Sequence, residues 1–151
     1  MGKADSLEGK VQAPIVVFAE GIEFTGSGFS GVHIGRRDKD ILTGFTSFGY
    51  SAVEGVYAEK GKSNWQNWNF KKHRRAEVPK HLDGTQVVFT DQVVYEGPSM
   101  GGHHFSFLKD GKYVGHDHGQ KLAIDFSYSL VKAIFDKTGK PIWKNLDYKE
   151  N

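Results

Sequence analysis

The chain contains no cysteine, and this absence removes several classes of structure and chemistry. Without thiols there is no disulfide scaffold, no thiolate nucleophile and no metal site with thiolate ligands. The absence leaves the compartment open, because cysteine-free proteins occur on both sides of a membrane.

Long apolar runs and a strong net charge are also missing. No apolar run approaches the roughly 18 residues of a membrane-spanning helix, and residues 1–10 contain no hydrophobic signal region. The net charge of +2 is too small to indicate a nucleic-acid or membrane partner. We therefore expect neither partner, while the localisation and the oligomeric state stay open.

Glycine and aromatic residues, in contrast, are abundant. The 151 residues include 19 Gly, 11 Phe, 6 Tyr and 3 Trp, a mixture that favours β-structure with tight turns. A chain of this length can bury a full hydrophobic core without metals or disulfides. Because residues 1–12 are polar and aperiodic, we expect a flexible N-terminal arm followed by a single β domain over residues 13–151.

An internal repeat is the strongest pattern in the sequence. Residues 48–71 align with residues 126–149 at an offset of 78 positions, and nine of the 24 aligned pairs are identical. A second series of identities, at an offset of 71 positions, relates residues 16–33 to residues 87–104. Matches of this extent predict an internal duplication.

The two offsets also locate the boundaries of the repeats. Since the offset grows from 71 to 78, the second copy carries a seven-residue insertion within residues 104–126. We place the repeats at residues 14–72 and 85–149, joined by the basic linker 73–84, which ends in a turn-forming Asp-Gly pair.

Apolar residues alternate with period two along residues 48–56 and again along residues 126–134. Helical periodicity is hard to find anywhere in the sequence. Roughly five or six short strands per repeat, separated by turn signals, give about ten to twelve strands in total. The predicted fold is therefore all-β, an internally duplicated and pseudo-two-fold β-barrel or β-sandwich.

Four polar residues that recur in both copies are candidate ligand-binding residues: His33, His104, Tyr50 and Tyr128. The two histidines either face one barrel interior, as hydrogen-bonding or acid–base groups, or bond to turn backbone as structural residues. The two tyrosines either supply polar hydroxyls to an apolar cavity or pack in a filled core with their hydroxyls bonded.

Trp65 is a fifth candidate ligand-binding residue. Together with Trp68 it lies among asparagines and a glutamine in residues 63–69, a composition typical of a strip on which aromatic faces stack against sugar rings. However, Trp65 recurs as Trp143 and Trp68 is replaced by Leu146, as core positions of a duplicated fold would be.

His116 and His118 form a candidate metal site. Two imidazoles two positions apart lie on one face of an extended segment, and such a pair can bind zinc, copper or nickel. The alternative is a glycine-flanked exposed loop whose histidines only tolerate solvent. We expect no required cofactor. A divalent metal bound by His116 and His118 is the only cofactor that these patterns suggest.

Two further motifs do not indicate a function. The string Gly26-x-Gly28-x-x-Gly31 fits a dinucleotide-binding fingerprint, but no helical pattern follows it and the second copy lacks the middle glycine, so we reject it. The basic run at residues 71–75 indicates a solvated linker more strongly than a nucleic-acid grip, given the low overall charge.

The function that we expect from these patterns is binding of a small organic molecule or a saccharide, in an aromatic-lined site with histidine and tyrosine as polar anchors. The alternative is a cofactor-free barrel enzyme, such as a cyclase, isomerase or hydrolase, in which a cavity histidine or tyrosine moves a proton. A third alternative is a structural protein that assembles through its pseudo-symmetry. Whether the protein is an enzyme stays open.

Overall fold

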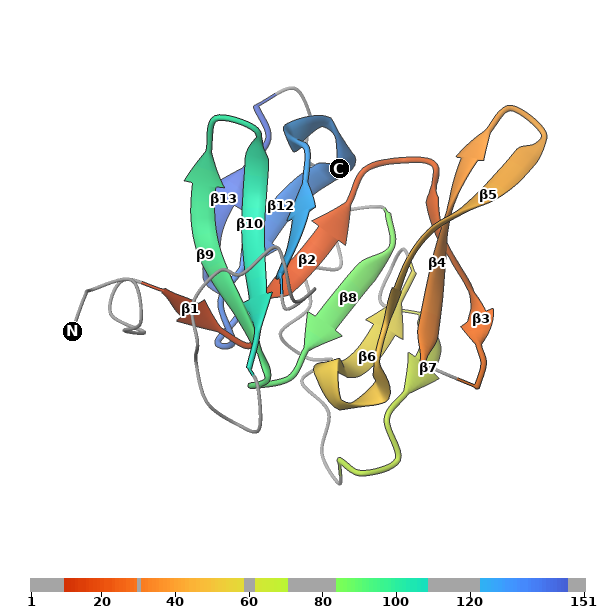
Figure 1. Ribbon diagram of the computed structural model, residues 1–151, viewed down its shortest axis with the longest axis horizontal. Helices are drawn as coiled ribbons and strands as arrows, with labels where there is room; N and C mark the ends of the chain where they lie inside the picture. The colour runs from red at the N-terminus through yellow and green to blue at the C-terminus, as the bar shows by residue number, and fades with distance from the viewer. Residues whose placement is uncertain (1–9, 30, 59–61, 71–83, 109–122, 147–151) are drawn as a thin grey trace.

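Strands make up most of the computed structural model, which describes residues 10–29, 31–58, 62–70, 84–108 and 123–146 (Figure 1). The strands are β1 (Val11–Gln12), β2 (Ile15–Phe18), β3 (Ile22–Ser27), β4 (Val32–Asp38), β5 (Ile41–Phe48), β6 (Val53–Tyr57), β7 (Ser63–Gln66), β8 (Gln86–Phe89), β9 (Val93–Ser99), β10 (Gly102–Phe107), β11 (Ala123–Phe126), β12 (Val131–Phe135) and β13 (Pro141–Lys144). Two short 3₁₀ turns, η2 (Tyr50–Ala52) and η6 (Tyr128–Leu130), precede β6 and β12. The predicted all-β class is confirmed.

These strands form three open sheets within the described residues. The largest has the order β13-β12-β2-β8-β6-β7, and the other two have the orders β1-β9-β10-β11 and β3-β4-β5. Strands β13 and β7 are the two ends of the largest sheet, and among the described residues no ladder joins them, so this sheet is not closed. The barrel alternative is therefore wrong for this part of the chain.

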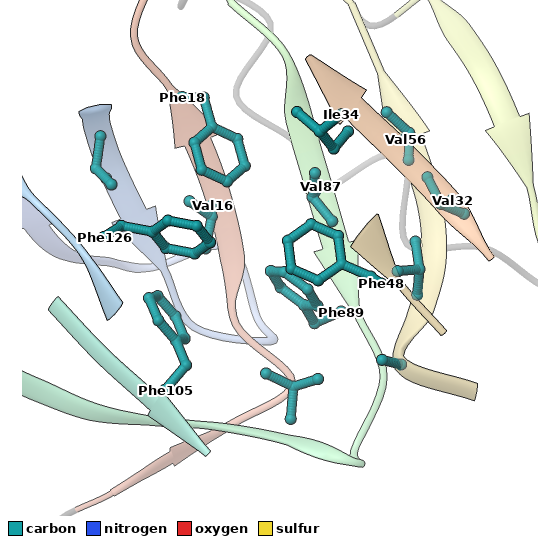
Figure 2. Close-up of a cluster of buried hydrophobic side chains, with 14 of the residues drawn as sticks. Val16, Phe18, Val32, Ile34, Phe48, Val56, Val87, Phe89, Phe105 and Phe126 are labelled. Carbon is teal, nitrogen blue, oxygen red and sulfur yellow. The ribbon is translucent and has the colours of Figure 1, made fainter. Parts of the chain in front are cut away.

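The main hydrophobic core lies where one face of the largest sheet meets the two smaller sheets. Figure 2 shows its aromatic centre, with side chains from β2, β8, β10, β11 and the end of β5 directed toward one another. Phe18 contacts Phe126 edge to face at 5.2 Å between ring centroids, and Phe48 contacts Phe89 in the same way at 5.1 Å. Edge-to-face pairs of this kind add about 0.5 to 1.5 kcal/mol each beyond the burial of their area.

Strand β2 is buried on both faces, which explains its unbroken apolar run. Successive side chains of a strand point to opposite faces. Val16 and Phe18 accordingly belong to the main core, whereas Ile15 and Val17 belong to a second buried cluster with Val88 and residues of β6 and β12. A strand buried on both sides needs apolar residues at every position.

Corresponding strands pair in corresponding registers. At the centre of the largest sheet, Val16 of β2 lies opposite Val87 of β8, its partner at the offset of 71. Val56 of β6 pairs with Val87, and Ile134 of β12 pairs with Val16. Val56 and Ile134 are aligned at the offset of 78, and Val16 and Val87 at the offset of 71, so the two ladders have the same register. Each ladder joins a strand from one half of the chain to a strand from the other half.

The ends of the chain add little to this picture. Val11 and Gln12, the last residues of the expected arm, pair with β9, and residues 1–9 lie outside the described parts. Residues 73–83 of the expected linker also lie outside them. Among the residues that the structure describes, no helix is long and apolar enough to cross a membrane.

Candidate functional site

His33 and Tyr50 lie together at one end of the β3–β4 hairpin. His33 is opposite Ser47 in the β4–β5 ladder, and its Nδ1 is 2.8 Å from Ser47 Oγ. Tyr50, in the turn η2 directly after β5, donates its hydroxyl hydrogen to the backbone carbonyl of Gly28. The tyrosine thus ties the hairpin end to the turn.

His104 and Tyr128 form the equivalent arrangement in the second half. Tyr128 donates its hydroxyl hydrogen to the backbone carbonyl of Ser99. The Nδ1 atom of His104 is 2.6 Å from Asp125 Oδ1, and its Nε2 atom is hydrogen-bonded to Ser99 Oγ. His104 therefore bridges a carboxylate and a hydroxyl, both on partly or fully exposed side chains.

The tautomer of neutral His104 follows from its partners. An ionised carboxylate can only accept hydrogen bonds, so Nδ1 must carry the proton and donate it to Asp125. The Nε2 atom is then an acceptor, and the hydroxyl of Ser99 is its donor. In the first half Gly28 stands in place of Ser99, and Ser47 stands in place of Asp125. The hydroxyl of Ser47 can donate or accept, so it does not fix the tautomer of His33, and glycine at position 28 has no hydroxyl to offer Nε2.

The two histidines do not share an enclosed interior. His33 lies on the three-stranded sheet and His104 on the four-stranded sheet, and both side chains are partly exposed. The two tyrosines lie beside the tryptophans instead, with centroid distances of 5.6 Å for Tyr50–Trp65 and 5.8 Å for Tyr128–Trp143. The hydroxyls bind backbone carbonyls, as the packing alternative describes.

His103, which was not among the candidate residues, is fully buried next to the His104 site. Its Nδ1 atom is 2.8 Å from the hydroxyl of Tyr95, and its ring contacts those of Trp143 and Tyr128 at centroid distances of 4.1 and 4.9 Å. Its Nε2 atom has no hydrogen-bond partner within the described residues. Desolvation, with a smaller contribution from His104, lowers the pKa of His103 to about 4.

The partner of His103 is perturbed in the direction that keeps it neutral. Burial, with the nearby Tyr128 as a lesser cause, raises the pKa of the Tyr95 hydroxyl well above its usual range. Val32 occupies the place of His103 in the first half, and the alignment showed this difference without showing that the histidine is buried.

A groove of about 360 Å³ runs beside the end of β7. It is lined by Trp65, Gln66, Asn67, Trp68 and Phe70. Trp68 is 95% exposed, whereas Trp65 is partly buried against the core. Trp65 is thus a candidate residue that lines this groove.

Asn67 fixes the turn that carries Trp68. Its Nδ2 atom donates to the carbonyls of Tyr50 and Val53 at 2.9 and 3.0 Å, and its Oδ1 atom accepts from the backbone N–H of Asn69 at 2.9 Å. The amide is thereby committed to backbone groups, so Asn67 supports the groove and is not a polar anchor for a ligand.

The candidate metal ligands cannot be placed. His116 and His118 lie within residues 109–122, outside the described parts of the chain. The described residues contain no group of three or more His, Asp or Glu side chains suited to a metal ion. The metal site stays a prediction from sequence.

Comparisons of this chain with protein-family models, with curated proteins and with solved structures found no match. The function is therefore argued from the geometry of these sites.

Proposed function

We propose that this protein binds a saccharide, or a small organic molecule with a flat apolar face, in the groove beside Trp68. The observation that carries the proposal is Trp68, a residue 95% exposed at a groove that Trp65 and Phe70 also line. Removing apolar surface from water stabilises by about 25 cal/mol for each Å², and an exposed indole does not gain this free energy. The apolar face of a ligand would recover that burial.

The size and the polar groups of the groove agree with a small ligand. Its volume of about 360 Å³ falls within the range of small-molecule sites. Gln66 donates from Nε2 to the hydroxyl of Tyr57 at 3.2 Å, which orients the amide, and an amide carbonyl oxygen can accept from a ligand hydroxyl. The groove therefore offers an aromatic plane and a directed acceptor.

The turn under Trp68 is ordered before any ligand arrives. Because the side chain of Asn67 holds this turn through three hydrogen bonds to backbone, binding would order little of the chain, and less entropy would be lost. Leu146 stands in place of Trp68 in the second half and is 96% exposed. That position tolerates an aliphatic residue, so the fold does not require the aromatic ring.

The test begins with a screen of simple saccharides and aromatic small molecules by tryptophan fluorescence, followed by calorimetry on the compounds that bind. Trp68→Leu introduces the residue that the second half carries. We expect this variant to lose at least about tenfold in affinity, with an unchanged melting temperature because the ring is exposed. Equal affinity for every compound in wild type and variant would contradict the proposal.

We also propose that the chain is an internal duplication, with repeats 14–72 and 85–149 folded as a pseudo-two-fold β-sandwich. The equal registers of β6 on β8 and of β12 on β2 support this proposal, as do the matching tyrosine contacts to the ends of the two hairpins. No nucleic-acid or membrane partner is part of the proposed function.

A further inference from the structure

The hydrogen bonds around His104 run from a hydroxyl through an imidazole to a carboxylate. Ser99 donates to Nε2, and Nδ1 donates to Asp125, so the imidazole is held in the tautomer that can take the serine proton. Nucleophilic serines of acyl-transfer enzymes are activated by this order of groups, on folds that are otherwise unrelated. The arrangement lies away from the Trp68 groove, on a different sheet.

The first half of the chain serves as an internal control for a purely structural role. There, Gly28 and Ser47 replace Ser99 and Asp125, yet Tyr50 makes the same contact with the end of its hairpin that Tyr128 makes in the second half. Neither the serine hydroxyl nor the carboxylate is needed to build this part of the fold. Because the fold does not require Ser99 and Asp125, we look for a chemical role for these two side chains.

We propose that Ser99 is a nucleophile that cleaves carboxylic esters, with His104 as its general base and Asp125 as the residue that positions the imidazole. Ser99 Oγ attacks the ester carbonyl carbon, and its proton passes to His104 Nε2. The tetrahedral oxyanion then collapses, the bond from carbonyl carbon to alcohol oxygen breaks, and His104 gives the proton to the departing alkoxide.

Water completes the turnover. It attacks the acyl group on Ser99 and gives one proton to His104 Nε2. When the bond between the acyl carbon and Ser99 Oγ breaks, His104 returns the proton to the serine, and a carboxylic acid leaves. No metal, oxidant or other co-reactant takes part in this sequence.

The hairpin turn after Ser99 supplies what the reacting ester would contact. Met100 and Gly101 form an exposed turn between β9 and β10 directly after Ser99 in the chain, so their backbone N–H groups are candidate donors to the oxyanion. The fully exposed side chain of Met100 gives an apolar contact for the alkyl or aryl part of the substrate. An open site of this kind fits small, accessible esters.

The decisive experiment is labelling of the full-length protein with a fluorophosphonate, which phosphonylates activated serines. We expect the adduct on Ser99, formed at least about 100-fold faster than on the exposed Ser51 and Ser129, since a general base contributes at least that factor. Ser99→Gly, which introduces the residue of the first half, should remove the adduct; Ser99→Ala repeats the test if glycine loosens the hairpin. Labelling of Ser99 no faster than of Ser51 would overturn the proposal.

Hydrolysis of p-nitrophenyl acetate separates serine chemistry from attack by the imidazole itself. Ser99→Gly keeps His104, so a variant that hydrolyses the ester as fast as wild type would show that the imidazole acts alone, and Ser99 would be excluded. Ser47→Ala, which alters the equivalent site in the first half, should leave the rate unchanged.

The role of Asp125 is tested by Asp125→Ser, the residue found at this place in the first half. We expect kcat for the ester to fall at least about tenfold, with KM and the melting temperature unchanged, and Asp125→Glu to restore part of the loss. A lower melting temperature with an unchanged kcat would assign Asp125 a structural role and remove it from the mechanism.

Discussion

The burial of His103 connects a single side chain to the acid stability of the whole domain. Desolvation lowers the pKa of this histidine from 6.5 to about 4 in the folded state. Between these two values the unfolded chain binds a proton that the folded chain does not. Stability from this group is therefore complete above pH 6.5 and falls progressively as the pH drops toward 4.

His103→Val is the matched variant for this prediction, because Val32 occupies the same place in the first half. The free energy of unfolding of wild type should fall by up to about 3 kcal/mol more than that of the variant between neutral pH and pH 4. Urea denaturation of both proteins across this range gives the difference. Parallel pH profiles would show that His103 is protonated to the same extent in both states.

Sequence reasoning found the histidines and tyrosines of the two hairpin ends but not their roles. The repeat pointed to His33 and His104 because they match at an offset of 71. What distinguishes them is the partner across the hairpin, Gly28 in one case and Ser99 in the other, and such a partner is visible only once the strands are paired. The sequence does show the substitution itself, because Ser99 stands where the string Gly26-x-Gly28-x-x-Gly31 has its middle glycine. It does not show that this position faces the histidine.

At the scale of elements, glycines set the approach of the hairpins to the strand ends. Gly102, at the start of β10, has a φ of +139°, and a Cβ atom there would clash with the backbone carbonyl oxygen of Phe126. Gly97, in the same hairpin, has a φ of +112° but no atom within 4 Å of the added Cβ position. The two positions thus separate steric overlap from conformational strain.

Gly102→Ala should destabilise the protein by about 3 kcal/mol or more, because the methyl group adds overlap with fixed backbone to an unfavourable φ. Gly97→Ala, which carries only the unfavourable φ, should cost about 1 kcal/mol. Chemical denaturation of the two variants measures both values. If Gly97→Ala proved as harmful as Gly102→Ala, the close approach of β10 to Phe126 would not be the cause.

Element types followed from the sequence more readily than their assembly. The apolar residues that follow Pro14 form β2, which is buried on both faces. Alternation along a strand tells which side chains are buried, but not which neighbour pairs with an edge strand. For that reason the sequence left barrel and sandwich open, and the open edges at β7 and β13 appeared only in the structure.

At the scale of the whole molecule, the two halves depend on each other for their central contacts. Strand β12 pairs with β2, and β6 pairs with β8, so each half supplies a strand to the other. The aromatic pairs Phe18–Phe126 and Phe48–Phe89 also join residues of different halves. A half-chain on its own lacks these ladders. It also lacks the apolar side chains of the other half that cover its own apolar side chains.

Separate fragments covering residues 1–78 and 79–151 test this dependence, with the cut placed in the expected linker. A chain of about 75 residues that has lost its central sheet neighbours retains too little buried area to offset its conformational entropy. We expect neither fragment to unfold cooperatively as a monomer, and we expect mixing to restore the near-ultraviolet circular dichroism of the intact chain. Because the β2–β8 register is centred on the matched pair of Val16 and Val87, any structure in one fragment alone should arise from a symmetric dimer, detected by concentration-dependent sedimentation. A folded monomer of either fragment would show that the halves are independent domains and that the shared core contributes little to stability.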